Sequence, residues 1–171
     1  NRNIDRLEKL INEILAFSKL ENGKMSMSFE PVDLKSISHD VIINIQQLAV
    51  NKSIEIHENI PDNLPKVYAD FGKLEQVLTN ILDNAIKFTP ENGRIIIEAK
   101  KFSNGNNVKE KLLNGSFLEV SVSDTGIGIS LDDQERIFDR FERATLYNNG
   151  VGLGLAIVKK IVDSHNGQIW V

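Results

Sequence analysis

The sequence predicts an α+β protein in which one layer of helices covers one sheet. Segments with apolar residues every three or four positions, typical of amphipathic helices, alternate irregularly with segments in which every second residue is apolar, typical of strands. Some neighbouring strands are joined directly as hairpins. This order favours a two-layer α/β sandwich over a doubly wound parallel sheet, in which strands and helices alternate regularly.

The composition excludes several classes of function. The 171 residues are 41% apolar and 26% charged, which is ordinary for a globular domain. A net charge of −4 gives no reason to expect a nucleic-acid partner. The absence of cysteine excludes disulfides, cysteine-ligated zinc and thiol catalysis. We expect the chain to be a piece of a longer protein, because it has no initiating Met and ends in a strand-like segment.

The first half of the chain predicts three helices and three short strands. Residues 1–21 place Ile4, Leu7, Ile11 and Ile14 on a heptad seam, which suits packing against a partner helix or against the same domain. The elements that follow are a strand at 25–29 that ends before Pro31, a helix from Asp33 to about Asn51, strands at 53–58 and 67–69, and a helix from Asp70 that ends before Pro90.

The second half predicts a hairpin and two further helices. The strands at 94–99 and 118–122 alternate with period two, and a long polar stretch at 103–115 connects them. The elements that follow are a short helix at 130–138, a loop at 145–149, a helix that opens at Gly150 and runs to about His165, and a last strand at 168–171.

An acidic turn with two glycines follows the second hairpin strand. Asp124 stands where that strand ends, and Gly126 and Gly128 follow at a spacing of two. Glycine lets the backbone approach a ligand closely, and a carboxylate beside such a turn can accept a hydrogen bond from a ligand amine. Alone, the pattern fits an ordinary strand-to-loop turn equally well.

Two asparagines interrupt an otherwise apolar helix. Asn80 and Asn84 are one helical turn apart and share a face, with Lys87 on roughly the same side. Asparagine is a poor helix former, but its amide oxygen suits Mg²⁺, and the lysine can pair with phosphate. The alternative interpretation is a solvated polar stripe.

A second glycine cluster, Gly150, Gly152 and Gly154, precedes the last helix, where free N–H groups can face phosphate. A packing turn is the alternative. The cluster is no P-loop, because no Lys-Ser/Thr pair follows it. Together the three clusters offer an amide for a metal, groups for phosphates and a carboxylate for a base. Adenine presents an exocyclic amine where guanine presents an oxygen, so the expected ligand is magnesium ATP.

Four motifs in this order resemble those of sensor histidine kinases of two-component systems. They are the N box at 80–90, the G1 box at 124–129, the F box at 137–143 and the G2 box at 150–158. Residues 17–24 are similar to the end of the second helix of that family's dimerisation and phosphoacceptor hairpin. The resemblance implies part of this hairpin at residues 1–24 and a catalytic domain with the Bergerat ATP-binding fold at residues 25–171.

The resemblance also implies roles for individual residues. Asn84 would coordinate magnesium, Asn80 would support the phosphates and the metal, and Lys87 would contact phosphate. Arg143 would reach the terminal phosphate, and Asp124 would bind the adenine amine. The other ATP-binding positions implied are Phe88, Gly126, Gly128, Ile129, Gly150, Gly152, Leu153, Gly154 and Leu155.

In this family the γ-phosphate of ATP passes to a histidine on the first hairpin helix and then to an aspartate of a response regulator. That first helix is not in this sequence, and His39, His57 and His165 match no phosphoacceptor motif. We therefore do not expect this chain to phosphorylate itself. The resemblance implies homodimerisation through the hairpin and a cytoplasmic position in a membrane-anchored kinase.

Three other functions differ from this interpretation in specific residues. ATPases of the gyrase, chaperone and mismatch-repair kind carry a glutamate at the position of Asn80, whose amide cannot act as a general base. The hairpin-like first helix disfavours a serine kinase of the anti-sigma type. The presence of Asn84 and Asp124 disfavours a scaffold without phosphotransfer.

The lid between Phe141 and Gly150 is short, and Val151 replaces the usual Thr or Ser of the G2 box.

Overall fold

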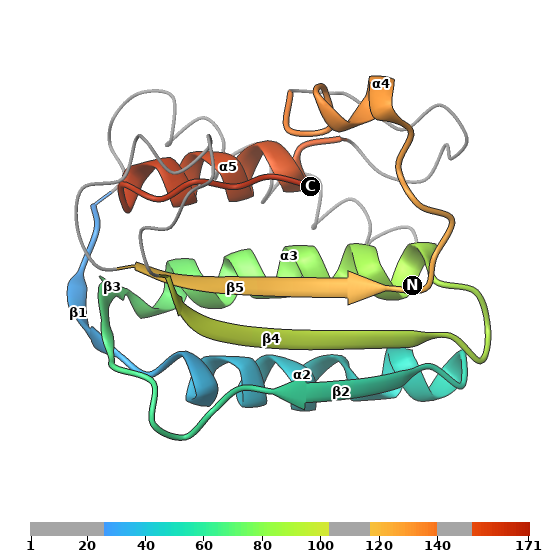
Figure 1. Ribbon diagram of the computed structural model, residues 1–171, viewed down its shortest axis with the longest axis horizontal. Coiled ribbons are helices and arrows are strands. Elements are labelled where there is room, and N and C mark those ends of the chain that lie inside the picture. The colour runs from blue at the N-terminus through green and yellow to red at the C-terminus, as the bar shows by residue number, and fades with distance from the viewer. Residues whose placement is uncertain (1–25, 103–116, 140–151) are drawn as a thin grey trace, which may run out of the picture. The chain divides into compact units, whose positions relative to one another are not determined.

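The computed structural model describes residues 26–102, 117–139 and 152–171. The chain divides into two compact units, Ser28–Gly128 and a second unit that combines Asn1–Met27 with Ile129–Val171. The helix expected at 1–21, the connection expected at 103–115 and the lid expected between Phe141 and Gly150 lie outside the described residues. The described residues of the larger unit form two helices and five strands, labelled in Figure 1.

The main sheet of the larger unit has the order β2-β4-β5. β2 (Glu55–Asn59) runs parallel to β4 (Arg94–Phe102), and β5 (Phe117–Asp124) runs antiparallel to β4. The β4–β5 pair confirms the expected hairpin. Its register places Phe102 opposite Phe117 at one end and Ile95 opposite Asp124 at the other. The end of β5, where the acidic turn begins, therefore lies beside the start of β4.

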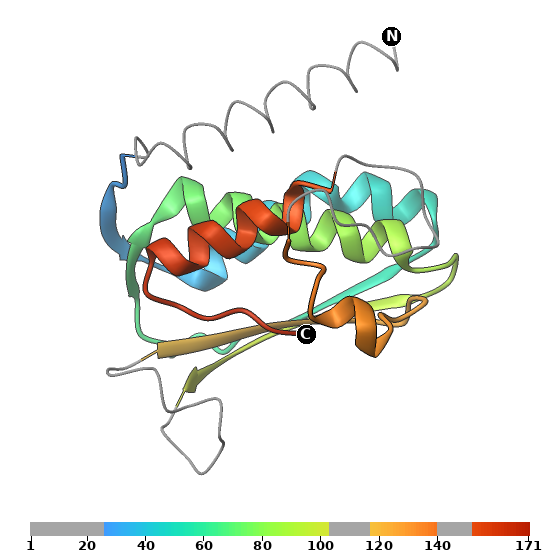
Figure 2. The ribbon, with the colours of Figure 1, turned by 90° about the horizontal axis from the view of Figure 1, so that it is seen from above.

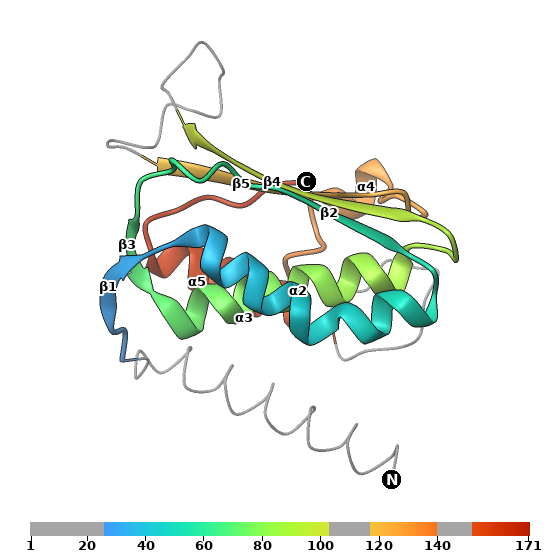
Figure 3. The same ribbon diagram turned by 90° about the horizontal axis from the view of Figure 1, so that it is seen from below.

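Two long helices lie on one face of this sheet, as Figures 2 and 3 show. They are α2 (Leu34–Asn51) and α3 (Phe71–Phe88), and each begins after the aspartate expected to cap it. The side chain of Asp33 accepts a hydrogen bond from the Lys35 N–H at 2.9 Å, and Asp70 accepts one from the Lys73 N–H at 3.0 Å. The α+β class, with helices on one face of a sheet, is confirmed.

The core of the larger unit lies between these helices and β4. Apolar residues at helical spacing on α2 and α3 meet the inward-facing residues of β4. Among the described residues, five apolar side chains are fully buried there: Ile37, Val41, Leu82, Ile95 and Ile97. None of the helices in the described ranges is both long and apolar enough to cross a membrane.

A second, two-stranded sheet departs from the expectation of a single sheet. β1 (Phe29–Val32) and β3 (Val67–Asp70) pair antiparallel, and Phe29 stacks on Tyr68 with ring centroids 5.8 Å apart. The strand expected at 25–29 therefore starts later and includes Pro31. Proline lacks an N–H, but a strand paired on only one side tolerates it.

The described part of the smaller unit contains two helices. α4 (Leu131–Gln134) is shorter than the helix expected at 130–138. One bond after it, from Ile137 N–H to Asp133, spans four residues, but those from Arg136 N–H to Asp133 and from Asp139 N–H to Arg136 span three, as in turns. α5 (Gly154–Ser164) begins after Gly152, whose φ of 73° is incompatible with an α-helix. The strand expected at 168–171 is wrong, because these residues join no strand pair in the described ranges.

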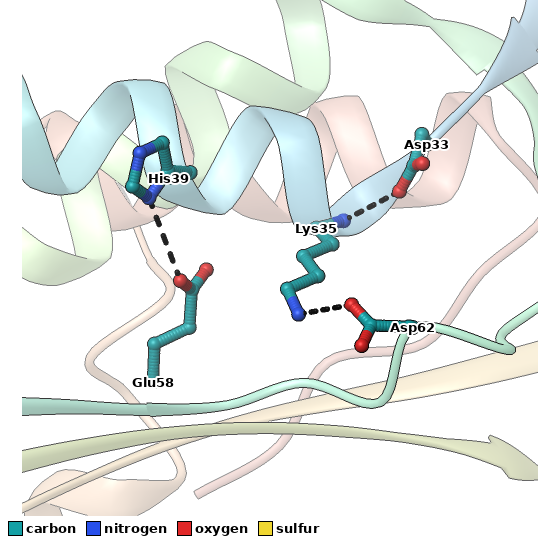
Figure 4. A network of polar contacts seen from close by, with 5 residues as sticks. All are labelled: Asp33, Lys35, His39, Glu58 and Asp62. Carbon is teal, nitrogen blue, oxygen red and sulfur yellow. Dashed lines mark hydrogen bonds and ion pairs between the residues drawn. The ribbon is translucent and has the colours of Figure 1, made fainter.

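A set of polar contacts joins α2 to the strand and loop that follow it, as Figure 4 shows. His39 Nδ1 lies 3.8 Å from a carboxylate oxygen of Glu58 on β2. Lys35 forms an ion pair with Asp62, whose side chain is 90% exposed. This pair lowers the pKa of Asp62 through the hydrogen bond and the charge of Lys35, and the hydrogen bond with Asp62 raises the pKa of Lys35.

The Lys35–Asp62 pair predicts a small pH dependence of stability. The folded state favours the Asp62 carboxylate, so the contribution is present above the unfolded pKa of 3.8 and is lost as the pH falls through the lower folded value. Asp62→Asn should slightly lower the unfolding temperature at pH 7, since exposed pairs contribute little. This difference should narrow below pH 3.8. Thermal melts of both proteins across this range test it, and a difference that grows in acid would contradict it.

Candidate functional site

The amide-bearing helix α3 divides into a buried face and an accessible face. Leu82 and Ala85 are buried in the core. Asn80 lies two positions before Leu82, and Asn84 lies one position before Ala85. Both asparagines are only partly buried, and they lie one helical turn apart. Lys87 is exposed near the end of the same helix. The apolar face therefore holds α3 on the sheet while both amides and the ammonium group stay accessible to a ligand.

The last turn of α3 presents a cation beside an aromatic ring. Lys87 Nζ lies 4.7 Å from the centroid of the Phe88 ring, a distance that allows a cation–π contact. The Thr89 N–H donates to the Ala85 carbonyl at 2.9 Å and closes the helix. A lysine in the last turn also interacts favourably with the negative end of the helix dipole.

Asp124 is the last residue of β5, and its carboxylate is held by its own loop. Oδ1 accepts a hydrogen bond from the Gly126 N–H at 2.8 Å. Within the described residues, Oδ2 accepts no hydrogen bond from protein, and the side chain is exposed. One oxygen therefore fixes the orientation of the carboxylate, and the other can accept a hydrogen bond from a ligand.

Gly126 brings this carboxylate to the end of α3. A Cβ atom at Gly126 would lie 2.8 Å from the carbonyl oxygen of Phe88 and 2.5 Å from Oδ1 of Asp124. A side chain therefore does not fit at this position. Gly128 is required for a different reason, since its φ is +72° although the space around it is open.

Thr125 anchors the same loop to β4, and the sequence did not identify it as a functional residue. Its N–H donates to the Arg94 carbonyl at 3.1 Å, and its Oγ1 accepts from the Arg94 N–H at 2.9 Å. These two bonds fix the turn between Asp124 and Gly126. The only signal in the sequence is the position of a hydroxyl residue between the carboxylate and the glycine.

The larger unit thus brings together part of the expected site. It joins Asp124 and Gly126 to Phe88, and hence to the helix that carries Asn80, Asn84 and Lys87. Arg143 and Gly150 lie outside the described residues. The expected positions that belong to the smaller unit are Ile129, Gly152, Leu153, Gly154 and Leu155, and their part in the site stays a prediction.

The groups present fit a metal ion that arrives with its ligand. No group of three or more His, Cys, Asp or Glu side chains arranged to hold a metal occurs in the part of the chain that the structure describes. Asn84 offers one partly covered amide oxygen. This set suits Mg²⁺, which keeps several waters and takes further ligands from phosphates. It does not suit an ion held by protein side chains alone.

Sequence comparison relates the chain to nucleotide-binding proteins. Residues 69–171 match the profile of the histidine kinase-, DNA gyrase B-, and HSP90-like ATPase family. The chain is 34% identical over 175 residues to the adaptive-response sensory kinase SasA of Prochlorococcus marinus (strain MIT 9303), an alignment that covers 99% of this chain and 44% of SasA. The chain thus spans less than half of that relative.

Solved structures agree with this relationship. Full-length ShkA in complex with AMPPNP matches with a TM-score of 0.77 and 34% identity, over 94% of this chain and 31% of ShkA. Histidine kinase ThkA in complex with the response regulator protein TrrA matches with a TM-score of 0.71 and 26% identity, over 99% of this chain and 44% of the ThkA chain.

Proposed function

Because this chain belongs to the histidine kinase-, DNA gyrase B-, and HSP90-like ATPase family and is the ATP-binding catalytic domain of a sensor histidine kinase, we propose that it transfers the γ-phosphate of ATP to a histidine on a dimerisation hairpin. The observation that carries the proposal is the contact between Gly126 and the Phe88 carbonyl. This contact places the Asp124 carboxylate, which suits a nucleotide base, beside the end of α3, whose accessible side chains suit phosphates.

Asp124 recognises adenine in this proposal. The carboxylate accepts a hydrogen bond from the exocyclic amine of adenine and would repel the oxygen that guanine has in its place. The Gly126 N–H already holds Oδ1 at 2.8 Å, so the carboxylate need not reorganise when the base binds.

The accessible face of α3 serves the phosphates. Asn84 holds Mg²⁺ through its amide oxygen, Asn80 supports the metal and the phosphates, and Lys87 pairs with a phosphate oxygen. The bound metal supplies charge neutralisation on the phosphate oxygens. We propose that Arg143 reaches the terminal phosphate and that the second glycine cluster binds phosphate oxygens.

Asn80 favours transfer over hydrolysis. An amide cannot take a proton from water, so α3 offers no general base at the position where the hydrolysing relatives carry glutamate. The γ-phosphate is then kept for an external nucleophile. The chain contributes by positioning the phosphate and neutralising its charge, which are the main contributions of a protein to phosphoryl transfer.

The acceptors proposed are a histidine of the hairpin in a homodimer of the whole protein and then an aspartate of a response regulator. ThkA, a structural relative, has been solved in complex with a response regulator protein. We also propose that residues 1–24 belong to that hairpin and that this domain lies on the cytoplasmic side of a membrane-anchored kinase.

Phosphotransfer to a separately supplied hairpin tests the proposal. The chain is incubated with magnesium ATP labelled on its γ-phosphate and with the histidine-bearing hairpin of its own protein. We expect label on the hairpin and none on the chain incubated alone. Asn84→Ala should lower the labelling rate by about tenfold or more, because a phosphate-bound metal loses its protein ligand. The difference in labelling rate between Asn84→Ala and the unchanged chain should become smaller as the Mg²⁺ concentration rises.

Two results would contradict this function in different ways. An unlabelled hairpin under conditions where ATP binds would favour a regulatory scaffold. Steady release of inorganic phosphate without the hairpin would favour an ATPase. Asp62→Asn, which changes an exposed side chain of the Lys35 ion pair, is the matched control and should leave labelling unchanged.

A further inference from the structure

One lysine outside the four motifs holds the end of the helix that carries the phosphate-binding residues. Lys52 caps the C-terminus of α2, and its Nζ donates to three carbonyl oxygens at the end of α3. The distances are 2.8 Å to Ile86, 3.0 Å to Lys87 and 2.9 Å to Thr89. An ammonium group has three N–H donors, so all of them are used at this one helix end.

These oxygens are groups that the helix itself leaves unpaired. The last carbonyls of an α-helix have no partner within it and form the negative end of its dipole. A cation that bonds several of them at once makes strong, charge-assisted hydrogen bonds. The contacts to Ile86 and Thr89 are also partly buried, which limits competition from water.

Lys52 is itself held in place by its backbone. Its N–H donates to the Ala49 carbonyl at 3.1 Å, which ends α2. Its carbonyl accepts from the Asn92 N–H at 3.0 Å, in the turn that leads from α3 into β4. Hydrogen bonds therefore hold both the backbone and the ammonium group of Lys52 in place, unlike those of a lysine on an open surface.

Lys52 does not bond to the Phe88 carbonyl in this turn, which lies beside the Asp124–Gly126 loop. The carbonyl oxygens of Ile86, Lys87 and Thr89 bond to Lys52. The carbonyl oxygen of Phe88 instead lies beside Gly126, only 2.8 Å from where a Cβ atom on that glycine would be. The end of α3 is thus held between Lys52 and Gly126. A shift of this turn would change the spacing between Lys87 and Asp124.

We propose that Lys52 is a positioning residue for the nucleotide site, which sets the place of the last turn of α3 against the Asp124–Gly126 loop. It touches neither the base nor the phosphates. It acts through the backbone of Lys87, Phe88 and Thr89. The inference rests on the proposed function, because it assigns Lys52 a role in the affinity of the same ATP site.

Lys52→Met tests the inference by removing the ammonium group and keeping an unbranched apolar side chain. ATP affinity is measured by calorimetry well below the unfolding temperature of each variant. We expect it to fall about tenfold, since small displacements of site residues carry costs of this order or more. The backbone amide resonance of Gly126 should shift as well, because the turn that it contacts has moved.

Lys35→Met is the matched control. It makes the same substitution near the other end of α2, which Lys52 caps, and removes an ion pair with Asp62, which lies outside the proposed nucleotide site. Its ATP affinity and its Gly126 resonance should equal those of the unchanged chain. If Lys52→Met does not fold, Lys52→Gln replaces it, because glutamine keeps two N–H donors without the charge.

The outcomes separate this inference from the function on which it rests. An unchanged chain that does not bind ATP would overturn both. If the unchanged chain binds ATP and the folded Lys52 variant binds it equally well, only the positioning role is overturned. A loss of ATP affinity without a shift of the Gly126 amide resonance would also overturn the positioning role. Such a loss would indicate a purely structural role, which does not act through the contact between the end of α3 and Gly126.

Discussion

Asp124→Asn is expected to weaken ATP binding by about ten- to hundredfold while the chain stays as stable as before. A hydrogen bond to a charged group contributes about 1.5–3 kcal/mol, and about 1.4 kcal/mol corresponds to a factor of ten in affinity. Asparagine can still accept the Gly126 N–H through its amide oxygen, so the loop keeps its shape. What is lost is the second carboxylate oxygen, which an N–H₂ group replaces.

Selectivity between bases sharpens this test. The substituted amide can donate to the oxygen of guanine, which the carboxylate repels. The ratio of ATP to GTP affinity should therefore fall in Asp124→Asn, as measured by calorimetry with each nucleotide. Asp62→Asn makes the same chemical change at an exposed position and should alter neither affinity. Equal ATP affinity in Asp124→Asn and the unchanged chain would remove Asp124 from the proposed site.

Gly126→Ala should abolish measurable ATP binding and also destabilise the chain. The added Cβ would lie 2.5 Å from Oδ1 of Asp124 and 2.8 Å from the Phe88 carbonyl oxygen, and this second clash is with backbone, which cannot rotate aside as a side chain can. Overpacking of this kind costs about 1–3 kcal/mol. Either the loop or the last turn of α3 must then move, and both carry groups of the proposed site.

Gly72→Ala provides the control for this glycine. A Cβ there would lie 3.7 Å from Oδ1 of Asp70, an ordinary contact, and the residue is in the first turn of α3. Alanine in a helix gains up to about 1 kcal/mol over glycine. Denaturant melts should therefore show opposite shifts for the two variants, with nucleotide affinity lost only in Gly126→Ala. Undiminished ATP affinity in Gly126→Ala would show that the loop does not face the nucleotide.

The parts of the fold that sequence predicted well depend on local signals. A capping aspartate followed by apolar residues at helical spacing fixed the starts of α2 and α3, because the cap and the first turn lie within four residues. Asp124 was expected at a strand end and lies there, because period-two alternation stops at that residue.

The parts that sequence missed depend on partners distant in the chain. The strand expected at 168–171 has β-branched and aromatic residues typical of strands, but a strand also needs a paired edge, which the described residues do not give it. Lys52 gave no signal, since a lysine after a helix is common and its partners lie 34–37 residues away. The bonds of Thr125 to Arg94, 31 residues apart, exist only once β4 and β5 are paired.

The register of the β4–β5 hairpin also bears on how this domain can diverge. Its two ends differ: Ile95 and Asp124 lie at the end that we propose to bind the nucleotide, and Phe102 and Phe117 lie at the other. At about 3.4 Å per residue, the ladder separates these ends by about 24 Å. Evolution can therefore lengthen, shorten or rewrite the chain between Phe102 and Phe117 while leaving nucleotide recognition under separate selection, and an engineer can insert a reporter there for the same reason.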